Sequence, residues 1–203
     1  MNKLLTRDPR GRFTKVLFEK TDKVFQVFAN NVIKQAKGNL KRKKKGGGKL
    51  EKSLRATTIQ EGKTRFELLF LSTDYGDFVN EGVKGKGGFK GSGRARGTGS
   101  PYRFGSGKFG GSWSKFKTNI SKWITSKGIK GRDKKGKFIS KDSLTYLIQR
   151  SIYQRGLERT LYFTNAFEKY YKQPFINKME TAYAEDVEDL LEKELEEQFN
   201  KIN

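Results

Sequence analysis

The chain of 203 residues contains no cysteine and no histidine. Without cysteine it cannot form disulfides or thiolate metal sites. Without histidine it lacks the commonest general base and metal ligand of proteins, so catalysis would have to rely on Asp, Glu or Lys. The sequence also has no zinc pattern and no Walker-type loop. We therefore expect a protein that is not an enzyme and that has no metal site and no cofactor.

Long apolar runs are missing as well. No stretch approaches the roughly 18 apolar residues of a membrane helix, and the first ten residues lack the apolar core of a signal peptide. Hydrophobic residues make up 33% of the chain and aromatic residues 13%. The first value is low for a compact globule and the second is high for a disordered chain, so we expect a modest core and much surface buried only against partners. We expect no membrane partner and no small-molecule substrate.

Charge is distributed unevenly along the chain. The net charge is +22, from 44 Lys or Arg against 22 Asp or Glu. Residues 82–132 contain thirteen Lys or Arg and no acidic residue, whereas residues 180–203 contain nine acidic residues and two lysines. A strongly basic surface attracts nucleic acids and acidic proteins. This asymmetry favours a part in an assembly that touches nucleic acid.

The first part of the chain has the pattern of a helix followed by a β-hairpin. Apolar periodicity predicts an amphipathic helix over residues 17–37 that ends near Gly38. Its apolar stripe comprises Leu17, Val24, Phe28, Val32 and Ala36. Residues 53–60 and 64–72 alternate as two strands, of which the second is more apolar and is expected to be the central one.

Helical spacing returns after a glycine-rich segment. It predicts helices over residues 112–127, 141–155, 162–171 and 175–199. The helix over 141–155 is expected to turn five residues inward, namely Leu144, Leu147, Ile148, Ser151 and Ile152. The last helix has a narrow apolar seam of Met179, Tyr183, Val187, Leu190, Leu191 and Leu195. We expect an α+β fold, in which a small antiparallel sheet (the hairpin of residues 53–72) packs on the N-terminal helix. The parts are a basic arm (1–16), an α+β core (17–81), a Gly-rich basic loop (82–111) and a helical region ending in an acidic helix (112–203).

A short basic pattern occurs twice, at residues 7–15 and 132–141. The shared form is Arg-Asp-x-basic-Gly-basic-Phe. Asp supplies a side-chain acceptor and Gly a positive φ three residues later, which predicts a tight turn before an extended segment. Either both copies are ordinary turns, or they share a binding function.

The Gly-rich basic loop is the main candidate site. It contains twelve glycines and seven basic residues: Lys84, Lys86, Lys90, Arg94, Arg96, Arg103 and Lys108. An isolated chain would leave such a segment flexible, so neighbouring subunits are the natural candidates to hold it. Its aromatic residues Phe89, Tyr102, Phe104 and Phe109 could stack on single-stranded bases, and its cations could instead contact duplex phosphates. The loop could also dock on an acidic helix of another subunit, or remain a solvated linker.

A second basic run, at residues 41–45, includes Lys43 and Lys44 and precedes three glycines. It reads as an exposed loop that is either a solvated tip or a phosphate contact.

The stretch from Val24 to Gly82 resembles the neck, or head–tail joining, proteins of long-tailed bacteriophages. The resemblance rests on Gly48-Lys-Leu50-Glu-Lys-Ser53-Leu54, on the hairpin that follows and on Tyr75-Gly-Asp-Phe78-Val79-Asn-Glu81-Gly82. Gly156-Leu157 followed by Phe163-Thr-Asn-Ala166 resembles a later segment of that family. The Gly-rich loop and the acidic helix exceed the usual family size, which fits a crAss-like or podovirus-like virion with several stacked neck rings.

This resemblance implies a structural virion protein, made in the bacterial cytoplasm, that forms a ring of about twelve copies between portal and tail. The implied partners are other copies of the chain, the portal, further neck or tail proteins, and double-stranded DNA held without sequence preference. Tyr75, Phe78 and Val79 would anchor a fold or subunit contact, and Leu190, Leu191 and Leu195 would form a docking seam. The alternative is a non-sequence-specific nucleic-acid-binding accessory protein of phage replication or packaging.

Overall fold

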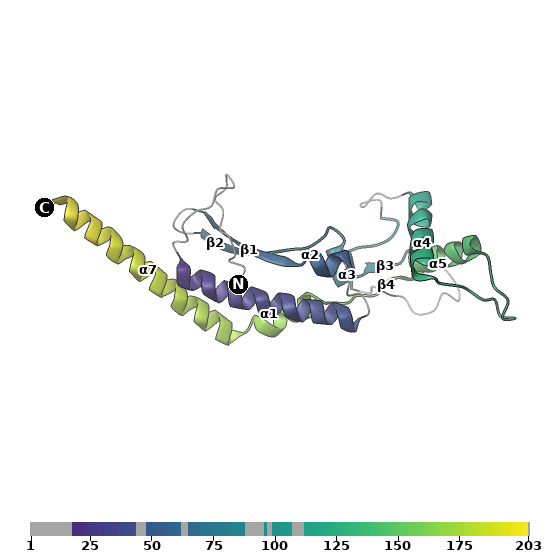
Figure 1. Cartoon of the computed structure of the whole chain (residues 1–203), viewed down its shortest axis with the longest axis horizontal. Helices are drawn as coiled ribbons and strands as arrows, with labels where there is room; N and C mark the ends of the chain where they lie inside the picture. The colour runs from purple at the N-terminus through teal and green to yellow at the C-terminus, as the bar shows by residue number, and fades with distance from the viewer. Residues whose placement is uncertain are drawn as a thin grey trace. The chain divides into compact units, whose positions relative to one another are not determined.

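The computed structural model describes residues 18–43, 48–61, 65–87, 96, 99–106 and 112–202. Over these residues the chain forms seven helices and four strands (Figure 1). They belong to two compact units. Unit 1 comprises Met1–Gly76 with Leu161–Asn203, and unit 2 comprises Asp77–Thr160. The predicted α+β class is confirmed, including the helical C-terminal half.

Unit 1 is built on the helix α1 (Glu19–Arg42). Its buried stripe includes Phe28, Val32 and Ala36, as the periodicity predicts, and continues to Leu40, which is fully buried. The prediction that the helix ends near Gly38 is wrong. The helix continues for another turn because Leu40 is buried and the Asn39 side chain donates a 2.8 Å hydrogen bond to the carbonyl of Tyr162. Tertiary packing here outweighs the poor helix propensity of glycine.

The predicted hairpin is present as β1 (Arg55–Glu61) and β2 (Arg65–Leu71), which pair antiparallel from Arg55↔Leu71 to Glu61↔Arg65. A one-turn helix α2 (Lys49–Ser53), which the sequence reading missed, leads into it. Leu54, Ala56 and Thr58 are buried, in agreement with the predicted alternation. The prediction of a central second strand is wrong, because within the described residues this sheet has two strands.

Phenylalanine rings join the hairpin to α1 and to the two C-terminal helices, α6 (Thr164–Tyr170) and α7 (Gln173–Ile202). The ring of Phe28 on α1 lies 6.3 Å from Phe70 of β2, 5.6 Å from Phe167 of α6 and 4.0 Å from Phe175 of α7. Aromatic pairs of this kind contribute about 0.5–1.5 kcal/mol each beyond their buried area. One side chain of α1 therefore contacts three other elements of unit 1.

The helices α1 and α7 run antiparallel, and α7 caps the N-terminus of α1 (Figure 1). No side chain at the N-cap residue Phe18 satisfies the free backbone N–H groups of α1. The buried carboxylate of Asp186 accepts these hydrogen bonds instead, from the backbone N–H of Lys20 at 3.0 Å and of Thr21 at 2.7 Å. The negative charge also suits the positive end of the helix dipole.

The ammonium group of Lys20 forms ion pairs with Glu185 and Asp189 of α7, each at 3.3 Å. Burial lowers the pKa of Lys20, and hydrogen bonds and charge interactions with the two carboxylates raise it by more, so the net shift is upward. These pairs lie at the surface, and we expect a smaller contribution from them than from the buried Asp186.

Unit 2 contains the remaining helices, α3 (Gly76–Glu81, which begins at the boundary), α4 (Trp113–Lys127) and α5 (Lys141–Arg155). Ser112 and Ser140 cap α4 and α5, each accepting a hydrogen bond from a backbone N–H three residues later. Gly128 ends α4 in the left-handed conformation, and Gly156 ends α5, as predicted. A second sheet, in which β3 (Val83–Lys84) pairs antiparallel with β4 (Gly156–Leu157), is absent from the sequence-based prediction because each strand has two residues.

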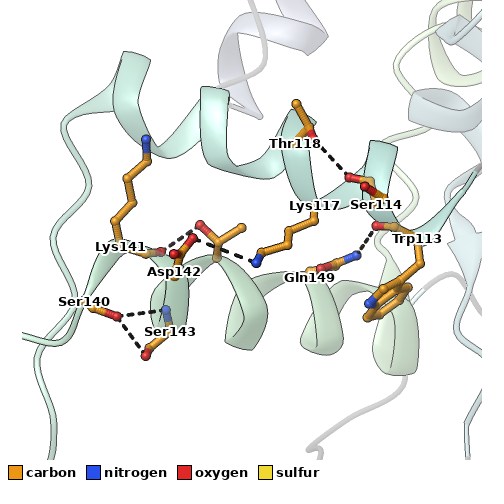
Figure 2. A network of polar contacts seen from close by, with 10 residues as sticks. Trp113, Ser114, Lys117, Thr118, Ser140, Lys141, Asp142, Ser143 and Gln149 are labelled. Carbon is orange, nitrogen blue, oxygen red and sulfur yellow. Dashed lines mark hydrogen bonds and ion pairs between the residues drawn. The ribbon is translucent and has the colours of Figure 1, made fainter.

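The buried face of α5 differs from the prediction. Thr145 and Gln149 are fully buried, whereas Leu147, which was predicted to point inward, is 52% exposed. Gln149 donates a 2.7 Å hydrogen bond to the carbonyl of Trp113 at the start of α4, and Lys117 of α4 lies 3.9 Å from Asp142 of α5 (Figure 2). The two helices therefore meet through polar contacts, and part of the apolar surface of α5 is left uncovered.

Replacement of Asp186 by alanine is predicted to destabilise the protein by about 2 kcal/mol, because two N–H groups of α1 would lose a charged acceptor. Urea denaturation of the full chain followed by circular dichroism measures this change. The matched control is Asp189→Ala on the same helix, which removes only a surface ion pair and is expected to cost less than about 0.5 kcal/mol. Equal losses for the two variants would refute the capping role.

Candidate polyanion-binding surface

Positive charge is concentrated in unit 2. Between Asp77 and Thr160 the sequence has 20 Lys or Arg and 5 Asp or Glu, a net charge of +15. The rest of the chain has 24 basic and 17 acidic residues, a net charge of +7. The unit that contains the Gly-rich loop therefore carries most of the excess charge in fewer than half of the residues.

Backbone hydrogen bonds hold the first part of this loop. The N–H of Lys84 in β3 donates to the carbonyl of Tyr102 at 2.8 Å, and the carbonyl of Lys84 accepts from the N–H of Phe104 at 2.9 Å. Arg103 lies between them, forms a parallel bridge with Lys84 and donates from its guanidinium group to the carbonyl of Lys86 at 3.3 Å. These contacts bring three cationic residues together.

The C-terminal end of α5 holds the other described residues of the loop. The N–H of Lys86 donates to the carbonyl of Tyr153 at 3.0 Å, and that of Arg96 donates to the carbonyl of Arg155 at 2.8 Å. The expectation that neighbouring subunits hold the loop is therefore wrong for these residues, because the chain's own β4 and α5 hold them. The side chains stay exposed, and together they form a basic cluster of Lys84, Lys86, Arg96 and Arg103.

Two glycines permit the close approach of these backbones. A Cβ atom on Gly85 would clash with the carbonyl oxygen of Gln154. Gly156 has a φ of +89°, and a Cβ atom there would clash with the carbonyl oxygen of Val83. Glycine at both positions lets β3 and β4 approach, which sets the positions of the basic residues beside them.

Two aromatic residues of the loop pack inside unit 2, which does not fit the base-stacking interpretation. Tyr102 packs edge-on against Phe78, with ring centroids 4.6 Å apart. Phe104 lies 6.0 Å from Phe116 of α4 and 5.9 Å from Tyr153 of α5. Both rings are half-buried. For these two residues, packing within unit 2 leaves less ring surface for stacking on bases.

Other predicted contact residues are separated from the basic cluster. Lys43 is an exposed residue at the C-terminus of α1 and belongs to unit 1. Four further predicted cations lie outside the described residues, namely Lys44, Lys90, Arg94 and Lys108, as do the aromatic residues Phe89 and Phe109. The described geometry therefore supports four of the nine predicted polyanion contacts as one cluster.

The predicted subunit contacts at Tyr75, Phe78 and Val79 have different environments. Tyr75 is 43% exposed, which leaves it open to a partner. Phe78 contacts Tyr102, and the carbonyl of Val79 accepts hydrogen bonds from the N–H and the hydroxyl of Thr160 at 3.3 and 2.6 Å. The last two residues are thus anchors within unit 2.

The apolar seam of α7 divides into two parts. Tyr183 is 43% exposed and stacks on the buried ring of Phe18 at 5.4 Å, so the first part of the seam packs against the core of unit 1. Leu190 is half-buried, whereas Leu191 and Leu195 are 56% and 57% exposed. The second part of the seam therefore projects apolar side chains into solvent.

The second copy of the repeated basic pattern forms the predicted turn. The Asp133 carboxylate accepts hydrogen bonds from the N–H groups of Lys135 and Lys137, both at 2.9 Å, and Gly136 has a φ of +80°. The Arg132 guanidinium carbon lies 3.8 Å from the ring centre of Phe138, a cation–π contact that the sequence reading did not foresee. The first copy, at residues 7–15, lies outside the described residues.

Within the described part of the chain there is no group of three His, Cys, Asp or Glu side chains placed to hold a metal ion. Across the same residues, no helix has the length and apolar character that crossing a membrane requires. Comparison with family models, curated proteins and solved structures gave no match. The resemblance to phage neck proteins therefore remains a prediction from short motifs.

Replacement of Gly85 by alanine is predicted to cost more than about 2 kcal/mol in unit 2, because the new methyl group would force β3 away from the end of α5. Hydrogen exchange at the amides of Lys84, Lys86 and Arg96 measures the loss of protection. Gly87→Ala is the control. Its Cβ would meet nothing within 4 Å, and only its positive φ would cost about 1 kcal/mol. Equal loss of protection in both variants would contradict the close-packing explanation.

Replacement of the basic cluster by serine is predicted to weaken DNA binding and to reduce the slope of log K against log salt by about 3 to 4, close to 0.9 for each phosphate contact. Fluorescence anisotropy with a random-sequence duplex at several salt concentrations measures the slope. A control variant removes the same charge from exposed positions of unit 1, at Lys23, Lys34, Lys49 and Lys52. An equal change of slope in both variants would mean that the cluster has no special role.

Proposed function

We propose that the protein is a structural virion protein that forms an oligomeric ring in a bacteriophage head–tail connector. In this proposal the ring joins portal to tail and surrounds the DNA channel. The support comes from the short neck-protein motifs, the arrangement of a helix on a hairpin, and the distribution of charge and apolar surface in unit 2.

One observation carries the proposal: unit 2 has very little core of its own. Among its described residues, the buried hydrophobic side chains are Val83 and Ile124, whereas unit 1 has twelve. Five large hydrophobic side chains of unit 2 are exposed, namely Trp113, Trp123, Phe138, Tyr146 and Leu147. Uncovered apolar surface on this scale is typical of an interaction site. A subunit of a stable assembly can leave such surface for its neighbours to cover.

Conformational restraint supports a role beside DNA. The described part of the loop is held to the end of α5 by backbone hydrogen bonds, and the four cationic side chains of the basic cluster remain exposed. Fixed cations can contact phosphates without reading sequence, and this suits a channel through which every part of a genome must pass. A small number of cations also limits adhesion to the passing DNA.

The same cluster is the observation that favours the second candidate, an accessory protein that binds nucleic acid without sequence preference. Such a protein would bind DNA as a free chain, and the binding would fall steeply with salt. It would not be retained in mature particles. The two candidates therefore differ in where the protein is found.

The copy number of the chain in purified particles distinguishes them. We expect about twelve copies or a small multiple, which is the number that the resemblance to neck proteins implies for a closed ring of identical subunits. Quantitative mass spectrometry against the major capsid protein measures this number. A variant in which Lys84, Lys86, Lys90, Arg94, Arg96 and Arg103 are replaced by serine is expected to give few infectious particles.

Absence of the chain from particles would refute the connector proposal and favour the accessory protein. Normal infectivity of the six-residue variant, with the chain still present in particles, would refute the role of the loop alone.

A further inference from the structure

The C-terminal part of α7 presents an apolar stripe to solvent. Leu191, Leu195 and Phe199 follow one another at intervals of four residues and are 56%, 57% and 67% exposed. Residues at this spacing lie on one side of a helix. An exposed stripe of three large apolar side chains on a helix is typical of a surface that binds another protein.

Carboxylates surround this stripe. The sequence from residue 188 to 197 contains Glu188, Asp189, Glu192, Glu194, Glu196 and Glu197, with one lysine. Successive residues of a helix differ by about 100° in direction, so Glu188, Glu192 and Glu194 border the apolar side chains. The partner surface must therefore be both apolar and basic. A nucleic acid does not fit, because its phosphates would face carboxylates.

The stripe lies at a defined end of unit 1. Asp186 caps the N-terminus of α1, so the residues of α7 that follow extend past that terminus (Figure 1). The chain crosses between the units at residues 76–77 and 160–161. Both crossings lie near the other end of α1, because Tyr162 is hydrogen-bonded to Asn39 and a Cβ on Gly76 would be 3.2 Å from the Tyr162 hydroxyl. The length of α1, about 36 Å, separates the stripe from these crossings.

The helix pair α4–α5 carries exposed residues of the complementary kinds. These helices expose Trp123, Tyr146 and Leu147 by 44%, 47% and 52%. The only acidic residue in the two helices is Asp142, whereas α4 alone has Lys115, Lys117, Lys122 and Lys127. The pair thus combines the exposed apolar side chains and the positive charge that the end of α7 requires.

We propose that the end of α7 in one copy docks on the α4–α5 pair of a second copy. The inference rests on the proposed function in one respect, namely that identical copies assemble. Docking of two α7 ends on each other would bring their carboxylates together, which is unfavourable. A contact between two different surfaces of the same chain is heterologous, and such contacts form a closed ring when the rotation between neighbours closes.

Two surface variants test the contact by complementation. The tail variant carries Leu191→Ser, Leu195→Ser and Phe199→Ser, and the helix-pair variant carries Trp123→Ser, Tyr146→Ser and Leu147→Ser. Each variant alone is expected to lose self-association by at least about tenfold in affinity. Their equimolar mixture is expected to form a 1:1 dimer and nothing larger. The intact α7 end of the helix-pair variant can dock on the intact α4–α5 pair of the tail variant, and no further intact surface is left. Sedimentation velocity of the full chains measures these masses.

The matched control replaces exposed apolar residues elsewhere, with Val27→Ser and Leu71→Ser, and is expected to assemble like the unmodified chain. Far-ultraviolet circular dichroism checks that each variant is folded. If a serine variant unfolds, charge reversal replaces it: Glu188→Lys with Glu192→Lys in one chain, and Lys122→Glu with Lys127→Glu in the other. Each of these alone is expected to stay monomeric, and the mixture is expected to assemble, because each reversed surface then meets its complement.

Three outcomes would overturn the inference. Self-association of the helix-pair variant alone would indicate contacts between α7 ends. Unchanged assembly of the tail variant would exclude the stripe. An unmodified chain that stays monomeric, yet is present in particles, would assign the stripe to a different basic protein and leave the connector proposal intact. Absence from particles with normal self-association would instead refute the connector proposal alone.

Discussion

The scarcity of apolar side chains is the constraint on which the rest of this structure depends. With 33% hydrophobic residues, the chain cannot build two full cores. The apolar side chains that become buried are concentrated around α1, where Phe28, Val32 and Leu40 are covered on several sides. Unit 2 is held instead by backbone hydrogen bonds, close glycine contacts, polar side chains such as Gln149 and half-buried aromatic pairs such as Phe78 with Tyr102. Most of the buried apolar side chains among the described residues therefore belong to unit 1, and unit 2 has few.

The acidic residues of α7 show how one helix can both stabilise the core of unit 1 and present an exposed surface. Asp186 is buried and satisfies backbone groups of α1, so its charge is used for folding. Glu185 and Asp189 pair with Lys20 at the edge of this contact. Beyond Asp189 the acidic side chains continue along the helix, and Leu191 and Leu195 become exposed. Near residue 190, α7 therefore changes from a segment that packs against α1 to a segment that exposes the apolar stripe and the carboxylates around it.

Much of the fold follows from local sequence patterns. The helix α1, the hairpin and the helices α4 to α7 were predicted because each is long enough for its periodicity to be read. The turn at Asp133 and Gly136 was predicted from residue chemistry, since its acceptor and its positive φ are local properties. The errors concern tertiary contacts. The extra turn of α1 depends on Tyr162, which is far away in the sequence, and two-residue strands such as β3 have no period to detect.

The composition of the candidate site was predictable from the sequence, but the spatial arrangement of its residues was not. Charge and glycine content identify the loop, whereas the bridge between Lys84 and Arg103 and the hydrogen bond from Arg103 to Lys86 are tertiary contacts that composition does not predict. The role of Phe104 was not predictable, because its partners Phe116 and Tyr153 come from helices whose facing sides the periodicity did not resolve. The exposure of Leu147 was missed for a related reason. The prediction for α5 considered the spacing of apolar residues alone, whereas the helix packs through Thr145 and Gln149.

The order of the basic and acidic segments along the chain determines which unit carries each charge. Because the basic unit is inserted after Gly76 and the acidic helix follows at the C-terminus, the two surfaces belong to different units of one subunit. A symmetric pairing of two copies through either surface would oppose like charges, and the cost would rise with every additional pair. Pairing unlike surfaces removes that cost and leaves the pair of copies with one unused basic surface and one unused acidic surface. In the proposed assembly, growth through unlike surfaces continues until the ends meet when the rotation between neighbours closes, and a closed ring is then the end point.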